Sequence, residues 1–234
     1  MAIFDTLDAI RFMSLRDIGL FRRSARTDAA IAQDRTTLGD RAAFEAAYAN
    51  GDPWASADPA YKYQRRKYET LLALLPDRRF AAALDLGCGV GQMSRMLGAR
   101  ADTVLGVDVA QGAVEFARRG AVDLPAVTFE QGDVTDLSPT LDGRFDLVVL
   151  ADTLYYLSPM DDALLKRLAL RVQRLLIHGG VCLLANHFFS GADRDSRLSR
   201  RIHRAFAWSP GFEVTSEHRR PFYLATVLRR VAAP

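Results

Sequence analysis

Residues 83–91 read Ala83-Leu84-Asp85-Leu86-Gly87-Cys88-Gly89-Val90-Gly91, an apolar run that ends in glycines at three alternate positions. The apolar run predicts a buried β-strand, and the glycines predict a tight turn into a following helix. Glycine at such a turn lets the backbone approach a ligand closely, and the first turn of the helix offers free amide donors. The stretch therefore predicts a ligand site at the end of a strand.

Short apolar runs of strand length continue along the chain and alternate with helical patterns. The strand-like runs are 82–86, 103–107, 127–131, 145–150 and 181–185, and the helical patterns are 91–97, 111–119 and 161–176. This alternation predicts a parallel sheet that is covered on both faces. Two last runs, 213–218 and 222–228, lie too close together for a helical crossover and predict an antiparallel pair. We therefore predict an α/β fold with a mostly parallel seven-stranded sheet and a C-terminal antiparallel hairpin.

The region before residue 41 has a different character. Apolar residues recur at near-helical spacing between Ile3 and Phe21, which predicts a helix packed on the domain or on a second subunit, so a homodimer stays open. Attachment to a membrane surface is the alternative interpretation. Residues 24–40 are polar without clear periodicity and predict a linker. We therefore divide the chain into an N-terminal helix and linker over 1–40 and one domain over 41–234, with helices predicted over 41–50 and 59–75.

Composition limits the compartment and the partners. The 234 residues carry a net charge of +3, and no run approaches the about 20 apolar residues of a membrane span. Cys88 and Cys182 lie far apart and lack metal-ligand spacing, so we expect no metal and a reducing, cytoplasmic location. The arginine clusters are typical of solvated helix faces, and we do not expect nucleic acid as a partner.

Acidic residues mark three consecutive predicted strands. Asp85 precedes the first glycine by two residues, Asp108 ends the second strand, and Asp133 follows the third. A carboxylate at Asp108 can accept both hydroxyls of a ribose, and one at Asp133 can accept from the exocyclic amine of adenine. Each one alone could instead cap a helix. A dinucleotide-binding loop requires Gly-x-Gly-x-x-Gly, and Gln92 stands where its third glycine would be, which disfavours NAD.

Together with Gly106-Val107-Asp108, Gly132-Asp133-Val134 and residues 145–149, these motifs resemble the class I S-adenosylmethionine-dependent methyltransferases over about residues 60–230. The resemblance implies a Rossmann-like fold and S-adenosylmethionine as the cofactor. It also implies that Asp108 holds the ribose, that Asp133 contacts the adenine, and that Asp85 and the glycines lie near the methionine moiety. The residues predicted to bind the cofactor are Asp85, Gly87, Cys88, Gly89, Gly91, Asp108, Val109, Asp133, Val134 and Asp152.

Two further segments resemble the nodulation-protein-S type of methyltransferase, which methylates an amino group on a sugar oligomer. The first runs from Phe44 through Asp52-Pro53-Trp54 and on through Tyr63, Lys67-Tyr68 and Leu71 to Pro76. The second is 151–157, where that type usually has Glu in place of Asp152. The stretch 186–212, which usually shapes the acceptor pocket, matches less well. The resemblance therefore implies an amino-sugar or glycan-like acceptor without fixing which one.

Methyl transfer is an in-line displacement, so we expect alignment to supply most of the catalysis. A neutral amine needs no base, whereas a hydroxyl does. The predicted catalytic residues are Asp152, Tyr155 and His187, and the predicted acceptor-binding residues are Trp54, Tyr63, Tyr155, Tyr156 and His187. Aromatic faces suit both a sulfonium cation and a sugar ring. An equally simple interpretation is that Trp54 and Tyr63 anchor the N-terminal helices to the core.

We predict methyl transfer to nitrogen in preference to oxygen. An RNA methyltransferase and a non-catalytic S-adenosylmethionine-binding protein are the alternatives, and the fourth-strand motif lacks the Asn-Pro-Pro-Tyr type of sequence of many enzymes that methylate base amino groups. Tyr155 and Tyr156 are expected to begin the next helix. His203 lies within Arg200-Arg201-Ile202-His203-Arg204 and is expected on a solvated helix face.

Overall fold

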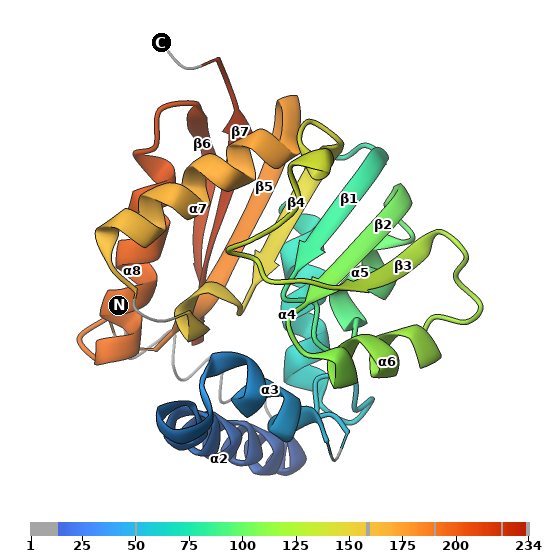
Figure 1. Cartoon of the computed structure of the whole chain (residues 1–234), viewed down its shortest axis with the longest axis vertical. Helices are drawn as coiled ribbons and strands as arrows, with labels where there is room; N and C mark the ends of the chain where they lie inside the picture. Colours follow the sequence, from blue (N-terminus) through green and yellow to red (C-terminus); the bar gives the residue numbers. More distant parts are fainter. Residues whose placement is uncertain (1–13, 50, 158–159, 190, 221, 233–234) are drawn as a thin grey trace.

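A computed structural model describes residues 14–49, 51–157, 160–189, 191–220 and 222–232. Seven strands form one sheet in the order β3-β2-β1-β4-β5-β7-β6 (Figure 1). Their bounds are β1 (Phe80–Leu86), β2 (Ala101–Asp108), β3 (Val127–Gln131), β4 (Phe145–Ala151), β5 (Leu176–Phe188), β6 (Phe212–Arg220) and β7 (Phe222–Arg230). The first five strands are parallel, and β7 is antiparallel to both β5 and β6. The predicted fold class and hairpin are confirmed.

Helices cover both faces of the sheet. They are α4 (Lys62–Ala73), α5 (Gln92–Leu97), α6 (Gln111–Arg119), α7 (Asp162–Leu175) and α8 (Arg194–Ala207), with a 3₁₀ turn η1 (Pro139–Leu141) before β4. Side chains of α4, α5 and α6 share one core cluster with the sheet, and those of α7 and α8 share another. A strand buried on both faces cannot show a polar–apolar alternation, which is why the sequence shows continuous apolar runs. None of the helices in the described ranges has the length and apolar character needed to cross a membrane.

The prediction of a linker over 24–40 is wrong. Helix α2 (Leu15–Leu38) runs through it and is followed by α3 (Asp40–Tyr48). Ser14 and Asp17 start α2 with a capping box, in which each side chain accepts from the other residue's amide. Only Asp17 and Ile31 of this helix are buried, so it has no apolar face for a periodicity search to find. Residues 3–13 of the predicted first helix lie outside the described residues.

Helices α2 and α3 lie across the carboxyl ends of the parallel strands, and we call this pair the roof (Figure 1). Glu45 of α3 fastens the roof to the domain by accepting from the amides of Gln111 and Gly112 at 2.6 and 3.2 Å. These amides belong to the first turn of α6, where a helix has donors without partners and favours a negative charge. The helix cap of α6 is therefore supplied by a residue 66 positions earlier in the chain.

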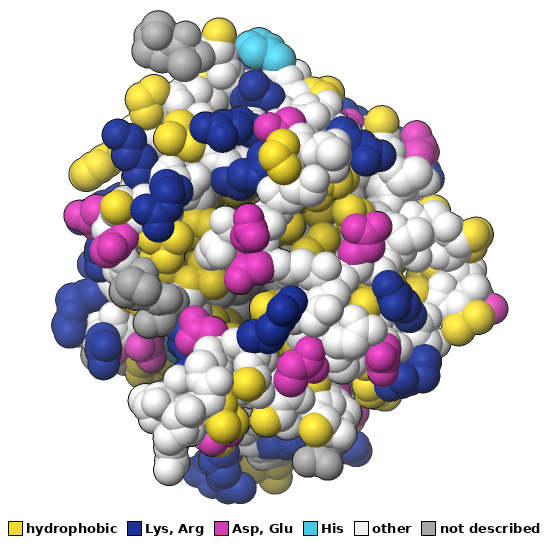
Figure 2. Space-filling model, in the orientation of Figure 1, with side chains coloured by type: hydrophobic (Ala, Val, Ile, Leu, Met, Phe, Trp, Pro, Cys, Tyr) yellow, Lys and Arg dark blue, Asp and Glu magenta, His cyan; other side chains and the backbone are white. Residues whose placement is uncertain are grey.

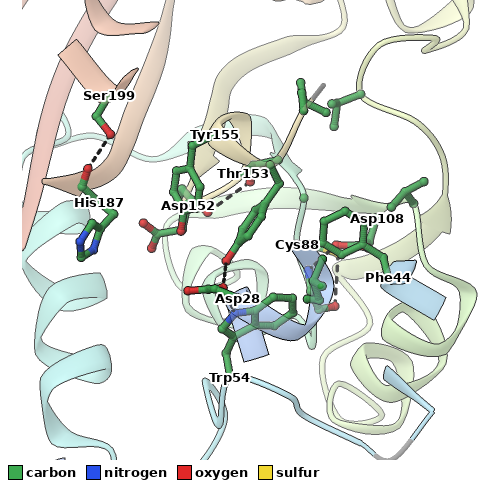
Figure 3. Close-up of a pocket in the computed structure, with 18 of the residues that line it drawn as sticks. Asp28, Phe44, Trp54, Cys88, Asp108, Asp152, Thr153, Tyr155, His187 and Ser199 are labelled. Atoms are coloured by element: carbon green, nitrogen blue, oxygen red, sulfur yellow. Dashed lines mark hydrogen bonds between the residues drawn. The ribbon is translucent and has the colours of Figure 1, made fainter. Parts of the chain in front are cut away.

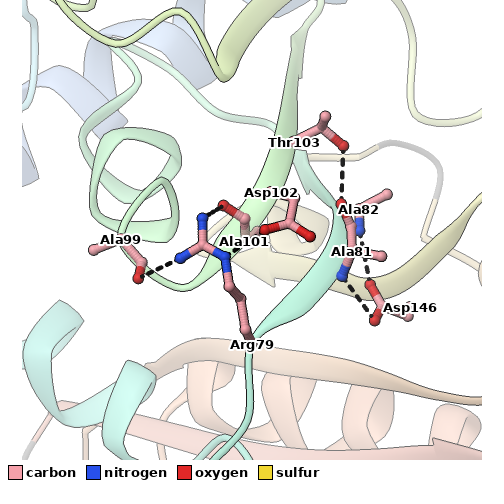
Figure 4. A network of polar contacts seen from close by, with 8 residues as sticks. All are labelled: Arg79, Ala81, Ala82, Ala99, Ala101, Asp102, Thr103 and Asp146. Atoms are coloured by element: carbon pink, nitrogen blue, oxygen red, sulfur yellow. Dashed lines mark hydrogen bonds and ion pairs between the residues drawn. The ribbon is translucent and has the colours of Figure 1, made fainter.

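Polar contacts join neighbouring strands at the opposite end of the sheet, where the parallel strands begin (Figure 4). The buried carboxylate of Asp146, at the start of β4, accepts from the amides of Ala81 and Ala82 at 3.0 and 2.9 Å. Arg79 pairs with Asp102, which ties the start of β1 to β2. These contacts tie the strands together at the end of the sheet that lies away from the roof.

His203 is buried, so its predicted place on a solvated helix face is wrong. Its Nδ1 lies 2.6 Å from the hydroxyl of Thr226 on β7, and burial lowers the pKa of the imidazole to about 3. Ile202 and Phe206 complete the same inner face of α8. Arg200, Arg201 and Arg204 are exposed on the other faces of α8, so the local sequence resembles that of a solvated helix.

Candidate functional site

A cavity of about 1740 Å³ lies between the roof and the carboxyl ends of the parallel strands (Figure 3). Figure 2 shows hydrophobic side chains in a depression between α7 and the roof, with acidic and basic side chains around it. Typical small-molecule sites occupy roughly 300–1,000 Å³. The cavity is therefore large enough for a nucleoside-sized molecule together with a second ligand.

The glycine turn forms one wall of this cavity through Gly87, Cys88 and Gly89. The φ angles of Gly87 and Gly89 are 73° and 52°, in the left-handed region that disfavours a side chain. A Cβ at Gly89 would also lie 2.9 Å from the hydroxyl of Tyr48. Gly91 shares the left-handed backbone but faces Phe129 in the core, at 2.7 Å from a hypothetical Cβ. Its glycine is therefore required by packing inside the domain.

Asp85 lies beneath the turn and does not line the cavity. Its carboxylate accepts from the hydroxyl of Ser94 at 2.6 Å, and burial raises its pKa to about 7. This contact joins the end of β1 to α5. Its predicted place beside the methionine moiety stays a prediction.

Asp108 and Asp133 both reach the cavity wall from consecutive strand ends. Asp108 accepts from the amides of Gly89 and Ala110 at 2.8 and 3.0 Å, so it also holds the glycine turn in place. Its burial raises the pKa of the carboxyl. Asp133 is exposed and accepts from the amide and hydroxyl of Thr135, both at 2.7 Å. Val109 and Val134 line the cavity beside them.

Asp152, at the end of β4, has a left-handed φ of 59°, an uncommon backbone conformation for a residue other than glycine. One of its oxygens pairs with the ammonium of Lys67, which is only 7% exposed. The other, Oδ1, is buried and has no hydrogen-bond partner among the residues that the structure describes. Sequence reasoning missed Lys67, although its spacing of four residues from Leu71 places it on the buried face of α4.

Tyr155 and Tyr156 lie in a separate 3₁₀ helix, η2 (Leu154–Tyr156), so the prediction that they begin the next helix is wrong. Their ring centroids are 4.4 Å apart, and both rings line the cavity. Burial holds the pKa of Tyr156 well above its ordinary value, and the neighbouring Tyr155 and Asp28 raise this pKa further. Its hydroxyl therefore keeps its proton and donates to Asp28 of the roof at 2.7 Å.

At the end of the cavity near His187, several of the lining side chains are aromatic. His187 lines it, and its backbone carbonyl accepts from the hydroxyl of Ser199 (Figure 3). Phe222 stands 5.8 Å from Tyr63 and 5.4 Å from Phe189 between ring centroids. Phe189 and Phe222 were not predicted as site residues. The structure thus gathers around one cavity every residue that was predicted for catalysis or acceptor binding, namely Trp54, Tyr63, Asp152, Tyr155, Tyr156 and His187.

Comparisons with known proteins give similarities in sequence. A family model described as a methyltransferase domain matches residues 84–184. Trans-aconitate 2-methyltransferase of Deinococcus radiodurans is 43% identical over 122 residues, which are 50% of this chain and 43% of that protein. Nodulation protein S of Rhizobium tropici is 28% identical over 152 residues, or 65% of this chain and 59% of the relative. The chain thus spans about half the length of the curated relatives it matches.

A comparison of folds agrees with these matches. The N-methyltransferase NodS of Bradyrhizobium japonicum WM9, in complex with S-adenosylhomocysteine, aligns with a TM-score of 0.68 at 20% identity. The alignment covers 81% of this chain and 97% of that one. The two chains therefore share a fold.

Proposed function

We propose that this chain, which has the motifs and fold of a class I S-adenosylmethionine-dependent methyltransferase and resembles the nodulation-protein-S type, methylates a small-molecule acceptor. The observation that carries the proposal is a single cavity with two differently equipped parts. One part holds the glycine turn and Asp108, and the other holds Asp152, His187 and aromatic side chains. A methyl transfer requires two ligands side by side, and the cavity offers room for both.

In this proposal the first part takes the cofactor, which supplies an electrophilic methyl group. The glycine turn receives the methionine moiety and Asp108 the ribose hydroxyls. Both oxygens of Asp108 already accept backbone amides, but a carboxylate oxygen has a second lone pair and can accept again. Asp133 then accepts from the adenine amine. The fit is supported by the left-handed glycines, which bring backbone and ligand close together.

The second part takes an acceptor amine, as on an amino sugar or a glycan-like compound. The unpartnered oxygen of Asp152 can accept from an amine N–H and so aim the nitrogen lone pair at the methyl group. Tyr63, Tyr155 and Tyr156 offer faces on which a sugar ring can rest. In this proposal His187, which lines the cavity, contacts the acceptor and takes up the proton that the nitrogen releases after methylation. Alignment by these groups is the main catalytic contribution.

A carboxylate acceptor is the second candidate, and Lys67 is the observation that favours it. A buried ammonium at the cavity can pair with an acceptor carboxylate. A relative that matches half of this chain is a trans-aconitate methyltransferase, whose name specifies a carboxylic acid. Transfer would then go to oxygen.

Calorimetric titration with S-adenosylhomocysteine tests the cofactor site, with NAD as the competing ligand. We expect the chain to bind S-adenosylhomocysteine and not NAD. The affinity of Asp108→Ala for S-adenosylhomocysteine should be lower by roughly tenfold or more, because a charge-assisted hydrogen bond contributes about 1.5–3 kcal/mol. Absence of binding by the unmodified chain, or equal binding by the variant, would overturn the assignment. A methylation screen over amino sugars, deacetylated chitin fragments and tricarboxylic acids then separates the two acceptor classes.

A further inference from the structure

Asp28 lies in the roof, in the part of α2 that the sequence does not mark as a site. Its Oδ1 accepts two hydrogen bonds, from the indole nitrogen of Trp54 at 2.8 Å and from the hydroxyl of Tyr156 at 2.7 Å. These donors come from two other segments of the chain. Asp28 is thus held at the junction of the roof, the loop before α4 and η2 (Figure 3).

A cluster of four aromatic rings lies beside this exposed carboxylate. The ring centroids of Trp54 and Tyr156 are 5.7 Å apart, Phe44 lies 5.6 Å from Tyr156, and Tyr48 lies 5.6 Å from Trp54. All four rings line the cavity together with Asp28. Aromatic faces attract a cation through their quadrupole, and a carboxylate among them adds a full negative charge. The combination has the chemistry of a binding site for an ammonium group.

The charge of Asp28 is not balanced within the described ranges of the chain. Asp152 has Lys67 as its partner, and Arg35, the cationic residue of α2 among those that line the cavity, is engaged in two hydrogen bonds with Asp40. An asparagine would satisfy Trp54 and Tyr156 equally well, because only an acceptor oxygen is needed. The carboxylate therefore contributes a charge that the contacts of the fold do not use.

We propose that Asp28 and the aromatic rings of Trp54 and Tyr156 form an ammonium-binding subsite. This inference rests on the proposed function for the identity of its ligand. Two ligands of a methyltransferase can carry the required group: the α-ammonium of the methionine moiety of the cofactor, and the acceptor amine, which would be captured here as an ammonium and would lose its proton before Asp152 receives the neutral nitrogen. Both would be held from the roof side of the cavity.

The informative variant is Asp28→Asn, which keeps the acceptor oxygen and removes the charge. Asp34→Asn is the matched control, since it removes a charge from the same helix away from the cavity lining. Calorimetric titrations use S-adenosylhomocysteine, and then glucosamine and its neutral N-acetyl derivative added to the loaded enzyme. Weaker S-adenosylhomocysteine binding in Asp28→Asn, by roughly tenfold, identifies the cofactor as the source. If only glucosamine binds more weakly, by the same factor, the acceptor is the source of the ammonium group. Unchanged binding of both ligands would overturn the subsite.

A second measurement does not depend on the proposed function. The chain has two tryptophans, so fluorescence in a Trp208→Phe background reports on Trp54 alone. Methylammonium chloride should produce a saturable change in emission, with sodium chloride at equal ionic strength as the control. Asp28→Asn should weaken this response roughly tenfold, and Asp28→Glu, which restores the charge, should recover part of it. A response that is not saturable, or that is equal in Asp28→Asn, rules the subsite out even if the chain binds S-adenosylhomocysteine.

Discussion

At the scale of single residues, the cavity is built on carboxylates in very different environments. Asp85 is buried against Ser94, Asp108 is held by backbone amides, and Asp152 is paired with Lys67, while Asp28 and Asp133 are exposed. Burial favours the neutral form of a carboxyl group, and hydrogen bonds or a cation favour its charged form. Burial raises the pKa of Asp85 and of Asp108, and Asp85 is the clearest case.

Replacing Asp85 by asparagine should change how stability depends on pH. The folded pKa of about 7 exceeds the ordinary value of 3.8, so the folded chain holds this proton more tightly than the unfolded chain does. The resulting contribution to the free energy of unfolding is complete below about pH 4 and is lost as the pH rises toward 7. Asp85→Asn still accepts from Ser94 and lacks this loss.

The difference in free energy of unfolding between the variant and the unmodified chain should therefore shift in favour of the variant from pH 5 to pH 8. The shift should be a few kcal/mol at most, since one pKa unit corresponds to about 1.4 kcal/mol. Urea denaturation at the two pH values measures the difference. An offset between the two proteins that does not vary with pH would contradict the assignment.

At the scale of helices and strands, Glu45 provides the sharpest prediction. Glu45→Ala removes the cap of α6 and the anchor of α3 in one change. We expect the free energy of unfolding to fall by about 1 kcal/mol, as for the loss of a helix cap. Amide hydrogen exchange should accelerate at Gln111 and Gly112 and along the roof.

Glu69→Ala is the matched control, because Glu69 is exposed and, among the residues that the structure describes, forms its ion pair with Arg65 one turn away. Its loss should cost at most about 0.5 kcal/mol and leave exchange in the roof unchanged. Equal behaviour of the two variants would mean that Glu45 does not fasten the roof.

The elements also show what could be predicted from the sequence. Helix α6 and strand β3 were predicted with their observed bounds, because continuous apolar runs and helical spacing record burial directly. Strand β5 is much longer than the predicted 181–185, because polar residues such as His178 extend it beyond the apolar run. Residues 15–21 of α2 were predicted as helix, but its remainder was predicted as a linker because it covers a cavity instead of a core.

At the scale of the whole molecule, Lys67 and Asp152 join segments 85 residues apart in the wall of the cavity. Removing one partner of a buried pair leaves an uncompensated charge, which typically costs about 3 kcal/mol or more. We expect Lys67→Met to lower the free energy of unfolding by about that amount. The double variant Lys67→Met/Asp152→Asn should recover most of the loss, since no buried charge remains.

Chemical denaturation of the single and double variants, with Asp152→Asn completing the cycle, measures this coupling. Additive losses would show that the two side chains act independently. The sequence predicted Asp152 from its place after β4. It could not reveal the partner, because the approach of α4 to β4 is set by packing between distant segments.

The division of the cavity into two parts has a consequence for how such a protein changes over evolutionary time. The glycine turn, Asp108, Asp133 and Asp152 all fall within residues 84–184, the segment matched by the methyltransferase family model. Asp28 and Trp54 precede that segment, and His187 and Phe222 follow it. In the proposed function, the part that receives the methyl donor is inherited with this inner segment, and Asp152, Tyr155 and Tyr156 of the acceptor part are inherited with it, while the flanking segments can diversify with little effect on the sheet. Homologues that share the inner segment would form a lineage with one chemistry and many acceptors.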